Sequence, residues 1–582
     1  MAHKSNYDKY PFLDGGTSAD CVEGWDAIAL QLANAKVVCV ECYPGARVDD
    51  IRFQMAQRLM PDTVINASRG YKSSAEIHAM LTPYLGDDRV FGHMNELTIK
   101  DWFRENALDQ LREDVIEAAA RGTVLLIGSG AALLASEPDV LVYADIARWE
   151  IQLRHRRFEM GNLGCDNAQA GFAEKYKCGY FAEWRAADRL KKEILPIVDF
   201  LLDTNNADTP KMVRGLAFRE ALMRAVQRPF RVVPYFDPGP WGGHWMEEVC
   251  GLSKGKPNYA WCFDCVLEEN SLLLGYGEKR VEVPAINLVI THPRELLGES
   301  VYTRFGAEFP IRFDFLDTMG GGNLSLQVHP LTEYIRDKFG MNYTQDESYY
   351  LLDAQPGATV YLGLKDNIDR SEMACDLRAA QTEGRNFPAD KYVNRFSANP
   401  HDHFLIPAGT IHCSGKDSMV LEISATPYIF TFKLWDWGRL GLDGRPRPIH
   451  IAHGLANIQW DRTTDWTRKN LVNALRPVAA GDGWREEVTG LHESEFIETR
   501  RHWFTKRVEH DTRDSFNVLN LVKGQEAVVE SSIGLFEPYV IHYAETFIVP
   551  AAVGQYTIRP HGIATGTECA TIKAFVRTSP NL

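Results

Sequence analysis

The 582-residue chain lacks the features that mark secreted and membrane proteins. Its first seven residues, 1–7, are polar and contain no apolar segment of the kind that a signal peptide needs. Its longest apolar run, residues 123–135, is interrupted at 128–130 and is too short to cross a bilayer. The eleven cysteines are scattered, and the Cys-X-X-Cys pair of Cys262 and Cys265 has no second pair to complete a zinc ribbon. These absences predict a cytoplasmic protein in a reducing compartment, with no membrane partner.

Positive charge is also in short supply. The chain has 63 Lys and Arg residues against 78 Asp and Glu residues, which gives a formal charge of −15. This balance argues against a nucleic-acid partner. It leaves an anionic small molecule open as a substrate, because a few basic residues can dominate one pocket. The length exceeds what one hydrophobic core supports, so we expect about three domains and allow for a homo-oligomer.

The amino-terminal region, residues 1–225, has the pattern of an α/β domain. The nearly continuous apolar run at 37–42 is typical of a buried parallel strand. Further buried strands are predicted at 123–127 and 140–144, and helices are predicted at the stretches 48–59, 99–120 and 181–202. Strands that alternate with helices predict a parallel sheet.

The sequence pattern changes after about residue 230, where short β-rich runs separated by Pro and Gly replace the alternating strands and helices. Closely spaced strands of this kind predict a barrel or jelly roll. We expect a first β-rich domain at 226–440, a helical insertion at 441–475 and a second β domain at 476–582, to which we assign only a lid or scaffold role. The predicted fold class is therefore multidomain, with an α/β domain followed by β-rich barrels.

Four side chains that can bind a metal stand at strand ends in the first β-rich domain. Gln327 and His329 are two residues apart, so on a strand they point to the same face. Glu347 begins the next strand, and His412 follows a Pro/Gly turn. Nitrogen and oxygen donors without thiolates suit Zn, Mn, Fe or Co and leave room for water or substrate. Each piece alone is more often a structural core residue than a ligand, and their order and surroundings favour one divalent transition metal on these four residues.

Seven sequence blocks follow one another in the carboxy-terminal part of the chain. They are Pro-Trp-Gly-Gly at 240–243 and the blocks 309–317, 324–330, 361–365, 406–412, 431–437 and 444–451. In their residues and their order, these blocks resemble motifs of the type I mannose-6-phosphate isomerases, which are cupin-fold zinc enzymes. The resemblance covers roughly residue 234 to the end of the chain. It implies a cupin fold, one Zn²⁺ per chain on Gln327, His329, Glu347 and His412, and the isomerisation of a sugar or sugar phosphate.

The isomerisation of an aldose to a ketose moves a proton between adjacent carbons through an enediol(ate). A divalent ion polarises the carbonyl group and stabilises the developing negative charge, and a base moves the proton. We predict Lys433 and Arg447 as substrate-binding or charge-stabilising groups, and Glu422 as a group that orients a ligand or moves protons. Structural ion pairs are the alternative for all three residues, and hydride transfer is the alternative route.

Two departures from the family pattern weaken the expectation of mannose 6-phosphate itself. Gln345 stands where family members usually carry Lys, and it can only form hydrogen bonds. Lys433 stands where they carry Arg, so the two-pronged grip that suits phosphate is lost. An unphosphorylated sugar or a different sugar phosphate is therefore an open candidate. We expect Asp346, beside Glu347, to point away from the site into solvent.

Residues 37–50 have the strand–turn–helix outline of a P-loop and faintly resemble uridine-kinase-like domains. The Gly-Lys-Ser/Thr signature is missing, and Asp49 and Asp50 would repel a phosphate. We interpret this region as a degenerate kinase fold kept for packing, oligomerisation or ligand sensing. Two alternatives stay open. One is a metal-containing sugar-binding regulatory protein without catalytic activity, and the other is a bifunctional kinase–isomerase that binds nucleotide at Gly45.

Overall fold

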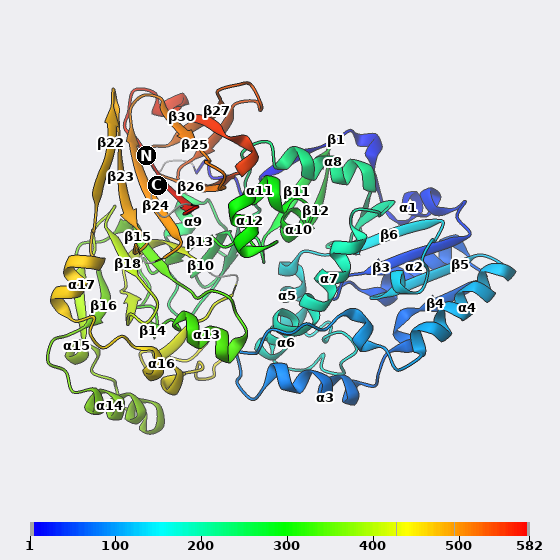
Figure 1. Ribbon diagram of the computed structural model, residues 1–582, viewed down its shortest axis with the longest axis horizontal. Helices are drawn as coiled ribbons and strands as arrows, with labels where there is room; N and C mark the ends of the chain where they lie inside the picture. Colours follow the sequence, from blue (N-terminus) through cyan, green and yellow to red (C-terminus); the bar gives the residue numbers. More distant parts are fainter. Residues whose placement is uncertain (1–4, 426–427, 494, 579–582) are drawn as a thin grey trace. The chain divides into compact units, whose positions relative to one another are not determined.

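The chain folds into two compact units (Figure 1). The computed structural model describes residues 5–425, 428–493 and 495–578. The α/β unit consists of Phe12–Ala225 and Glu268–Thr291, and the β unit consists of the other described residues. Residues 268–291, which the sequence placed among the barrel strands, thus group with the amino-terminal region. The four domain limits expected from the sequence stay a prediction.

The α/β unit is built on a seven-stranded sheet. Its order is β2 (Cys21–Glu23), β8 (Lys211–Arg214), β7 (Phe200–Asp203), β6 (Val140–Asp145), β3 (Val37–Cys42), β5 (Val124–Gly128) and β4 (Thr63–Asn66). The central strand β3 pairs in parallel with both β5 and β6, as its apolar run predicts. Its side chains are buried because the parallel sheet is covered on both faces.

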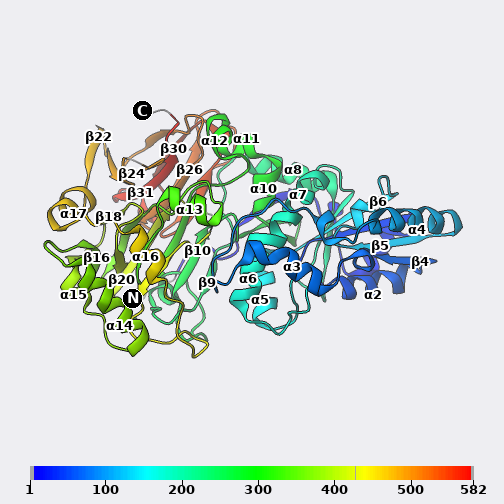
Figure 2. The same cartoon turned by 60° about the horizontal axis from the view of Figure 1, so that its bottom comes forward.

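Helices surround this sheet at the places where the sequence has 3.6-residue periodicity. They are α1 (Trp25–Leu32), α2 (Val48–Leu59), α3 (Ser74–Leu85), α4 (Ala107–Arg121), α5 (Arg148–Arg156), α6 (Phe172–Cys178), α7 (Trp184–Ile194) and α8 (Gly215–Ala225). Both α2 and α4 pack against β5 (Figure 2). The predicted end of the helix at 181–202 was wrong. The helix α7 stops at Ile194, and Phe200–Asp203 forms the strand β7.

Residues 268–291 add a small sheet and a helix to the same unit. The strand β1 (Phe12–Gly16) pairs with β11 (Ser271–Tyr276), which pairs with β12 (Lys279–Pro284), and α10 (Ile286–Thr291) follows. The pairing of β1 with β11 joins segments that lie far apart in the sequence, so no local pattern could indicate it.

The first barrel of the β unit consists of two antiparallel sheets. The six-stranded sheet runs β18 (His403–Ile406), β15 (Glu347–Ala354), β20 (Ser418–Ser424), β13 (Arg312–Asp317), β10 (Trp261–Cys265) and β9 (Tyr235–Asp237). The five-stranded sheet runs β17 (Val393–Ser397), β16 (Thr359–Leu364), β19 (His412–Ser414), β14 (Leu326–Val328) and β21 (Phe432–Trp435).

The second barrel has the same two-sheet construction. One sheet runs β22 (Arg476–Gly481), β23 (Trp484–Gly490), β24 (Ile497–Phe504), β31 (Cys569–Val576), β26 (Asn517–Lys523) and β29 (Thr546–Val549). The other runs β25 (Val508–Asp511), β30 (Gln555–Pro560), β27 (Glu526–Ser531) and β28 (Tyr539–His542). A shared core that includes Phe504, Leu519, Val529 and Ile558 fills the space between them.

Helices connect the two barrels. The helices α16 (Ile451–Asn457) and α17 (Thr464–Leu471) lie in the stretch where the sequence predicts a helical insertion. Among the described residues, no helix combines the length and the apolar character that crossing a bilayer requires. The strands of the first barrel are short and closely spaced, and their ends carry the candidate site.

Candidate metal centre

Strand pairing in the first barrel brings the predicted ligands together from distant parts of the chain. The short strand β14 lies between β19 and β21, so Gln327 is the register partner of His412 on one side and of Lys433 on the other. Glu347 is the first residue of β15 in the other sheet. Both sheets therefore contribute side chains to one site.

Three of the four predicted ligands form a compact buried triad. The His329 Nε2 atom lies 3.1 Å from Glu347 Oε2, and the His412 Nε2 atom lies 2.8 Å from Glu347 Oε1. Their ligand atoms all lie within 4.8 Å of one another, and all three side chains are fully buried. Zinc bonds of about 2.0–2.2 Å to nitrogen and oxygen can span such a set.

Backbone carbonyl groups fix the tautomers of both histidines. His329 Nδ1 lies 2.8 Å from the Phe430 carbonyl oxygen, and His412 Nδ1 lies 2.9 Å from that of Thr410. A carbonyl oxygen can only accept, so each Nδ1 carries a hydrogen, and in the neutral form of each ring a lone pair at Nε2 faces Glu347. Within the described residues, His329 Nε2 and Glu347 Oε1 have no hydrogen-bond partner.

This arrangement brings hydrogen-bond acceptors together in a buried space, because two imidazole lone pairs face a carboxylate. Burying these groups together is unfavourable unless a cation or a proton lies between them. A divalent metal fits this donor set. Gln327 places its amide 3.2 Å from His412 Nε2, and a half-turn of that amide exchanges its nitrogen for its oxygen. The four residues thus remain our predicted ligands.

Gln345 holds the Glu347 carboxylate in position. Its amide Nε2 donates to Glu347 Oε2 at 2.9 Å, and its Oε1 accepts from the Phe430 backbone N–H at 2.9 Å. The peptide of Phe430 therefore orients both His329 and Gln345. Sequence reasoning noticed Gln345 only as a lost lysine and missed the Phe430 and Thr410 backbone groups, for which the sequence carries no side-chain signal.

Glu422 and Lys433 lie on strands that carry or flank the ligands. Glu422 pairs across strands with Tyr349 and Asp314. Burial, with the charges of Asp314 and Glu347, raises the pKa of Glu422 well above its usual range. Burial, helped by the charge of Arg447, lowers the pKa of the half-buried Lys433 to about 7.

Arg447 is engaged in an ion pair. Its Nη1 lies 3.2 Å from both carboxylate oxygens of Asp436 and donates to Ser325 Oγ at 3.0 Å. Arg439 also binds Asp436, at 2.8 Å. These bonds link Arg447 to Ser325, which directly precedes β14, and to Asp436, which directly follows β21. A substrate-binding role for Arg447 stays a prediction.

The expectation that Asp346 is solvated was wrong. Its side chain is only partly exposed, and its Oδ1 accepts from the Ala408 backbone N–H at 2.8 Å. Burial raises the pKa of Asp346 to about 6 despite this bond. Asp346 therefore fastens the Pro/Gly turn that precedes His412.

The P-loop-like turn of the α/β unit has its own neighbours. The strand β3 is the first parallel strand and lies between β5 and β6, so its carboxyl end is the switch point where ligands of such sheets bind. There a Cβ on Gly45 would lie 2.6 Å from Ile151 of α5, and Arg154 donates to the Gly45 carbonyl at 2.8 Å.

Side chains of the α/β unit satisfy the other polar groups at this switch point. The Glu41 carboxylate accepts from the backbone N–H groups of Gly130 and Ala132 at 2.7 and 2.8 Å, as a bound anion would. Lys191 bridges Asp145 and Asn287 at 2.9 Å each. The kinase-like character of this unit is not confirmed by these observations.

Comparisons with known proteins give one match to a domain profile and several matches to curated proteins. A family profile described as "Domain of unknown function (DUF8485)" matches residues 24–227. The mannose-6-phosphate isomerase ManA of Bacillus subtilis is 27% identical over 168 residues, which cover 29% of this chain and 49% of the relative. The mannose-6-phosphate isomerase of Streptococcus mutans is 24% identical over 278 residues, which cover 47% and 77%.

These curated relatives confirm the resemblance to mannose-6-phosphate isomerases that the sequence predicts. The chain spans about half the length of the first relative and about three quarters of the second. A crystal structure of the mannose 6-phosphate isomerase from Bacillus subtilis shares 20% identity and a TM-score of 0.48, and the match covers 60% of this chain and 99% of that one.

Proposed function

We propose that this chain is a metal-dependent aldose–ketose isomerase of the cupin fold that acts on a sugar or a sugar phosphate. The observation that carries the proposal is the buried triad, in which the lone pairs of His329 and His412 face the Glu347 carboxylate within 3.1 Å. These three residues and Gln327 would hold one divalent ion, zinc by preference, because nitrogen and oxygen donors of this kind suit it. The isomerase names of the curated relatives support the same reaction class.

The neighbouring side chains suit the proton movements of this reaction. A divalent cation, when bound, polarises the carbonyl oxygen of the sugar and stabilises the negative charge that develops on it. Lys433, with a pKa of about 7, can accept a proton at neutral pH, and the raised pKa of Glu422 suits a group that donates one. In a hydride shift the hydrogen at C2 passes directly to C1, while a hydroxyl proton still moves between the two oxygens. Exchange of the C2 hydrogen with solvent during conversion therefore separates the two routes.

Whether the substrate carries a phosphate group depends on which side chains near the site are free to bind it. The Lys433 ammonium has no hydrogen bond or ion pair within the described residues, so it could receive an anion. Arg447 is already bound to Asp436, and Gln345 is bound to Glu347. One free lysine is a weaker phosphate site than an arginine fork, so both phosphorylated and unphosphorylated sugars belong in the test.

A sugar-binding regulatory protein is the second candidate, and Gln345 favours it. Because both ends of the Gln345 amide are engaged, this residue cannot handle protons as a lysine there would. In that case a metal-containing barrel binds a sugar without turning it over. For the α/β unit we propose a kinase-like scaffold without phosphoryl transfer, because its switch point is filled by Glu41, Ile151 and Lys191. A cytoplasmic location is part of the same proposal.

The test combines metal content with proton exchange at C2 of the sugar. Elemental analysis and deuterium exchange are run on wild type, on His412→Ala and on His403→Ala, a histidine that is equally buried in the same barrel. A panel of aldoses with and without a 6-phosphate serves as substrate. We expect one equivalent of metal and exchange in wild type and His403→Ala, and neither in His412→Ala. Metal without conversion of any aldose to its ketose would favour the regulatory protein. Conversion without exchange would favour the hydride shift, and no metal would overturn the site.

A further inference from the structure

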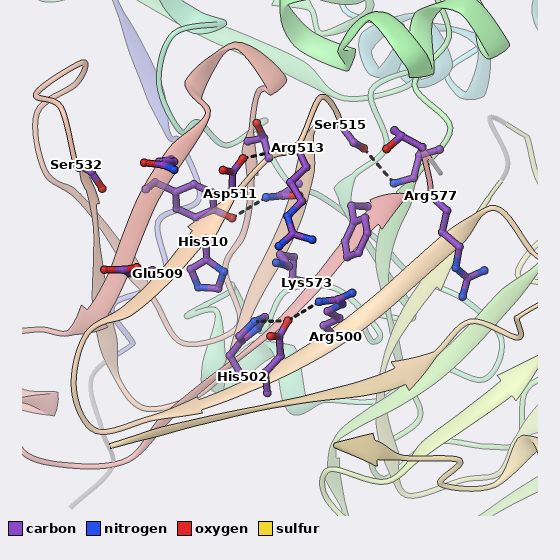
Figure 3. Close-up of a pocket in the computed structure, with 18 residues that line it drawn as sticks. Arg500, His502, Glu509, His510, Asp511, Arg513, Ser515, Ser532, Lys573 and Arg577 are labelled. Carbon is purple, nitrogen blue, oxygen red and sulfur yellow. Dashed lines mark hydrogen bonds and ion pairs between the residues drawn. The ribbon is translucent and has the colours of Figure 1, made fainter. Parts of the chain in front are cut away.

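The second barrel encloses a cavity of about 390 Å³ that the metal centre does not use (Figure 3). Its volume lies near the lower end of small-molecule sites, which span about 300–1,000 Å³. The walls come from both sheets, since Arg500 and His502 lie on β24, Lys573 on β31 and His510 on β25. Arg500 and Lys573 are register partners, so their side chains leave the sheet on the same face.

Three of the lining side chains are buried and keep unsatisfied polar atoms. His502, His510 and Lys573 are 2%, 5% and 7% exposed. Within the described residues, both ring nitrogens of His510 and the Nδ1 atom of His502 have no hydrogen-bond partner. The Lys573 ammonium likewise makes no hydrogen bond or ion pair there. Groups like these are costly in a folded protein unless a ligand or water satisfies them.

The protonation states of these groups define what the cavity offers. His502 Nε2 lies 3.1 Å from the Glu486 carboxylate and donates to it, so His502 Nδ1 carries a lone pair. Burial holds the pKa of His510 well below its usual range, so this ring is neutral and offers one donor and one acceptor. Burial also lowers the pKa of Lys573, to about 8, which leaves it mostly charged at neutral pH.

The charges of the cavity favour an anionic group over a cation. Glu486 is already paired with Arg500 at 3.0 Å and with His502. The guanidinium of Arg513 has no ion pair within the described residues, and Figure 3 shows it reaching toward the same space as His510 and Lys573. Glu509 and Asp511 stand at the more exposed edge of the cavity.

A metal ion fits this cavity poorly. Among the described residues, the triad of the first barrel is the only group of three His, Cys, Asp or Glu side chains whose ligand atoms converge within 4.8 Å. Aromatic faces are present instead, because His510 stacks on Tyr556 with ring centroids 5.0 Å apart. Flat rings beside lone pairs and donors suit a polyhydroxylated ligand.

We propose that the second barrel binds a monosaccharide phosphate at a site of its own, with His502 and His510 on the hydroxyl groups and with Lys573 and Arg513 on the phosphate. This site does not depend on the activity of the metal centre. It replaces the lid or scaffold role expected for this domain with that of a small-molecule binding module, through which sugar phosphate could control the chain.

Calorimetric titration of the full chain tests the proposal. The His412→Ala background disables the metal centre, and mannose 6-phosphate, mannose and inorganic phosphate are the probes. We expect one equivalent of mannose 6-phosphate to bind. A further Lys573→Met or His510→Phe substitution should weaken this binding by roughly tenfold or more. Lys506→Met is the matched control, since Lys506 forms an exposed ion pair with Asp482 in the same barrel. This control should bind like the His412→Ala parent.

A second measurement needs no substitution in the cavity. Addition of mannose 6-phosphate to the His412→Ala chain should shift the imidazole NMR signals of His502 and His510, and the His78 signal should stay in place. Absence of both heat and signal shifts would overturn the site. Equal binding of mannose would overturn the role of the phosphate, and equal binding of inorganic phosphate would reduce the site to an anion site and overturn the sugar. Unchanged affinity in both cavity variants would place the ligand elsewhere.

Discussion

The two barrels both turn a pair of histidines inward, yet the pairs are prepared for different partners. In the first barrel, carbonyl groups of Phe430 and Thr410 take the Nδ1 hydrogens, so two lone pairs face a carboxylate. In the second barrel, the carboxylate of Glu486 takes the Nε2 hydrogen of His502, and the lone pair faces a cavity. The surroundings of the lone pairs thus differ. In the first barrel they converge with a carboxylate on one point, and among the described residues of the second barrel no such set of three ligand atoms converges.

The carboxylates of the two barrels differ in the same sense. Glu347 is buried beside two imidazole rings and the amide of Gln345, and within the described residues no Lys or Arg pairs with it. Glu486 has Arg500 at 3.0 Å, so its charge is already balanced by the protein. An unbalanced buried carboxylate is the mark of a metal centre, and a balanced one is the mark of a structural support.

The largest expected effect comes from removing the unbalanced charge. Glu347→Gln should lower metal affinity at least about a hundredfold, because it removes the anionic ligand between the two imidazole rings. C2 exchange should be lost with the metal. Metal content after dialysis measures the effect, and Glu486→Gln, the counterpart in the second barrel, should retain one equivalent. Equal loss in both variants would erase the distinction between the barrels.

A smaller effect is expected at the residue that positions Glu347. Gln345→Ala removes the bonds to Glu347 Oε2 and to the Phe430 backbone N–H, so metal affinity should fall about 10- to 100-fold, as it does when other such supporting contacts are lost. Competition with a chelator of known affinity measures it. Asn517→Ala, which removes the bond to the Tyr556 hydroxyl group in the second barrel, serves as the control. An affinity equal to that of wild type would show that Gln345 does not orient the carboxylate.

Metal removal should change stability only where the triad is intact. Free metal at a hundred times its dissociation constant stabilises a folded protein by about 2.7 kcal/mol. Thermal unfolding with and without chelator should therefore differ for wild type and for Lys573→Met, and should coincide for His412→Ala. A chelator effect that persists in His412→Ala would place the stabilising metal outside the first barrel.

The sequence predicts those parts of the molecule whose signals are local. The apolar run at 37–42 and the periodic stretch at 48–59 match β3 and α2, because burial on a parallel sheet and helical spacing leave a local pattern. Strand alternation and turn residues alone left a structural role open for each triad residue, and the order of the sequence blocks that resemble the isomerase family pointed to the three together. The end of the helix expected at 181–202 was not predictable from the sequence, because residues 200–202 form a strand that pairs with β6.

Features made by distant pairing could not be read from the sequence. The cavity of the second barrel joins His502, His510 and Lys573 from three strands, and no spacing between them signals a site. Residues 268–291 join the α/β unit because β11 pairs with β1, far away along the chain. In the sequence, Gln345 stands out only as the absence of the lysine that the family usually has. Its two hydrogen bonds in the structure show that it holds the Glu347 carboxylate and the Phe430 peptide.

The smallest expected effect is the contribution of Lys573, in the second barrel, to the pH dependence of stability. Lys573 has a folded-state pKa of about 8, below the value of about 10.4 for an exposed lysine. Between these two values the unfolded chain binds more protons than the folded one, so wild-type stability should rise with pH in this window. Lys573→Met lacks that rise. Its free energy of unfolding relative to wild type should therefore be higher at pH 7.5 than at pH 10, by on the order of 1 kcal/mol. Urea unfolding at the two pH values measures this difference, with Lys506→Met as the exposed control. A difference that does not change with pH would mean that Lys573 is as well solvated in the folded protein as in the unfolded chain.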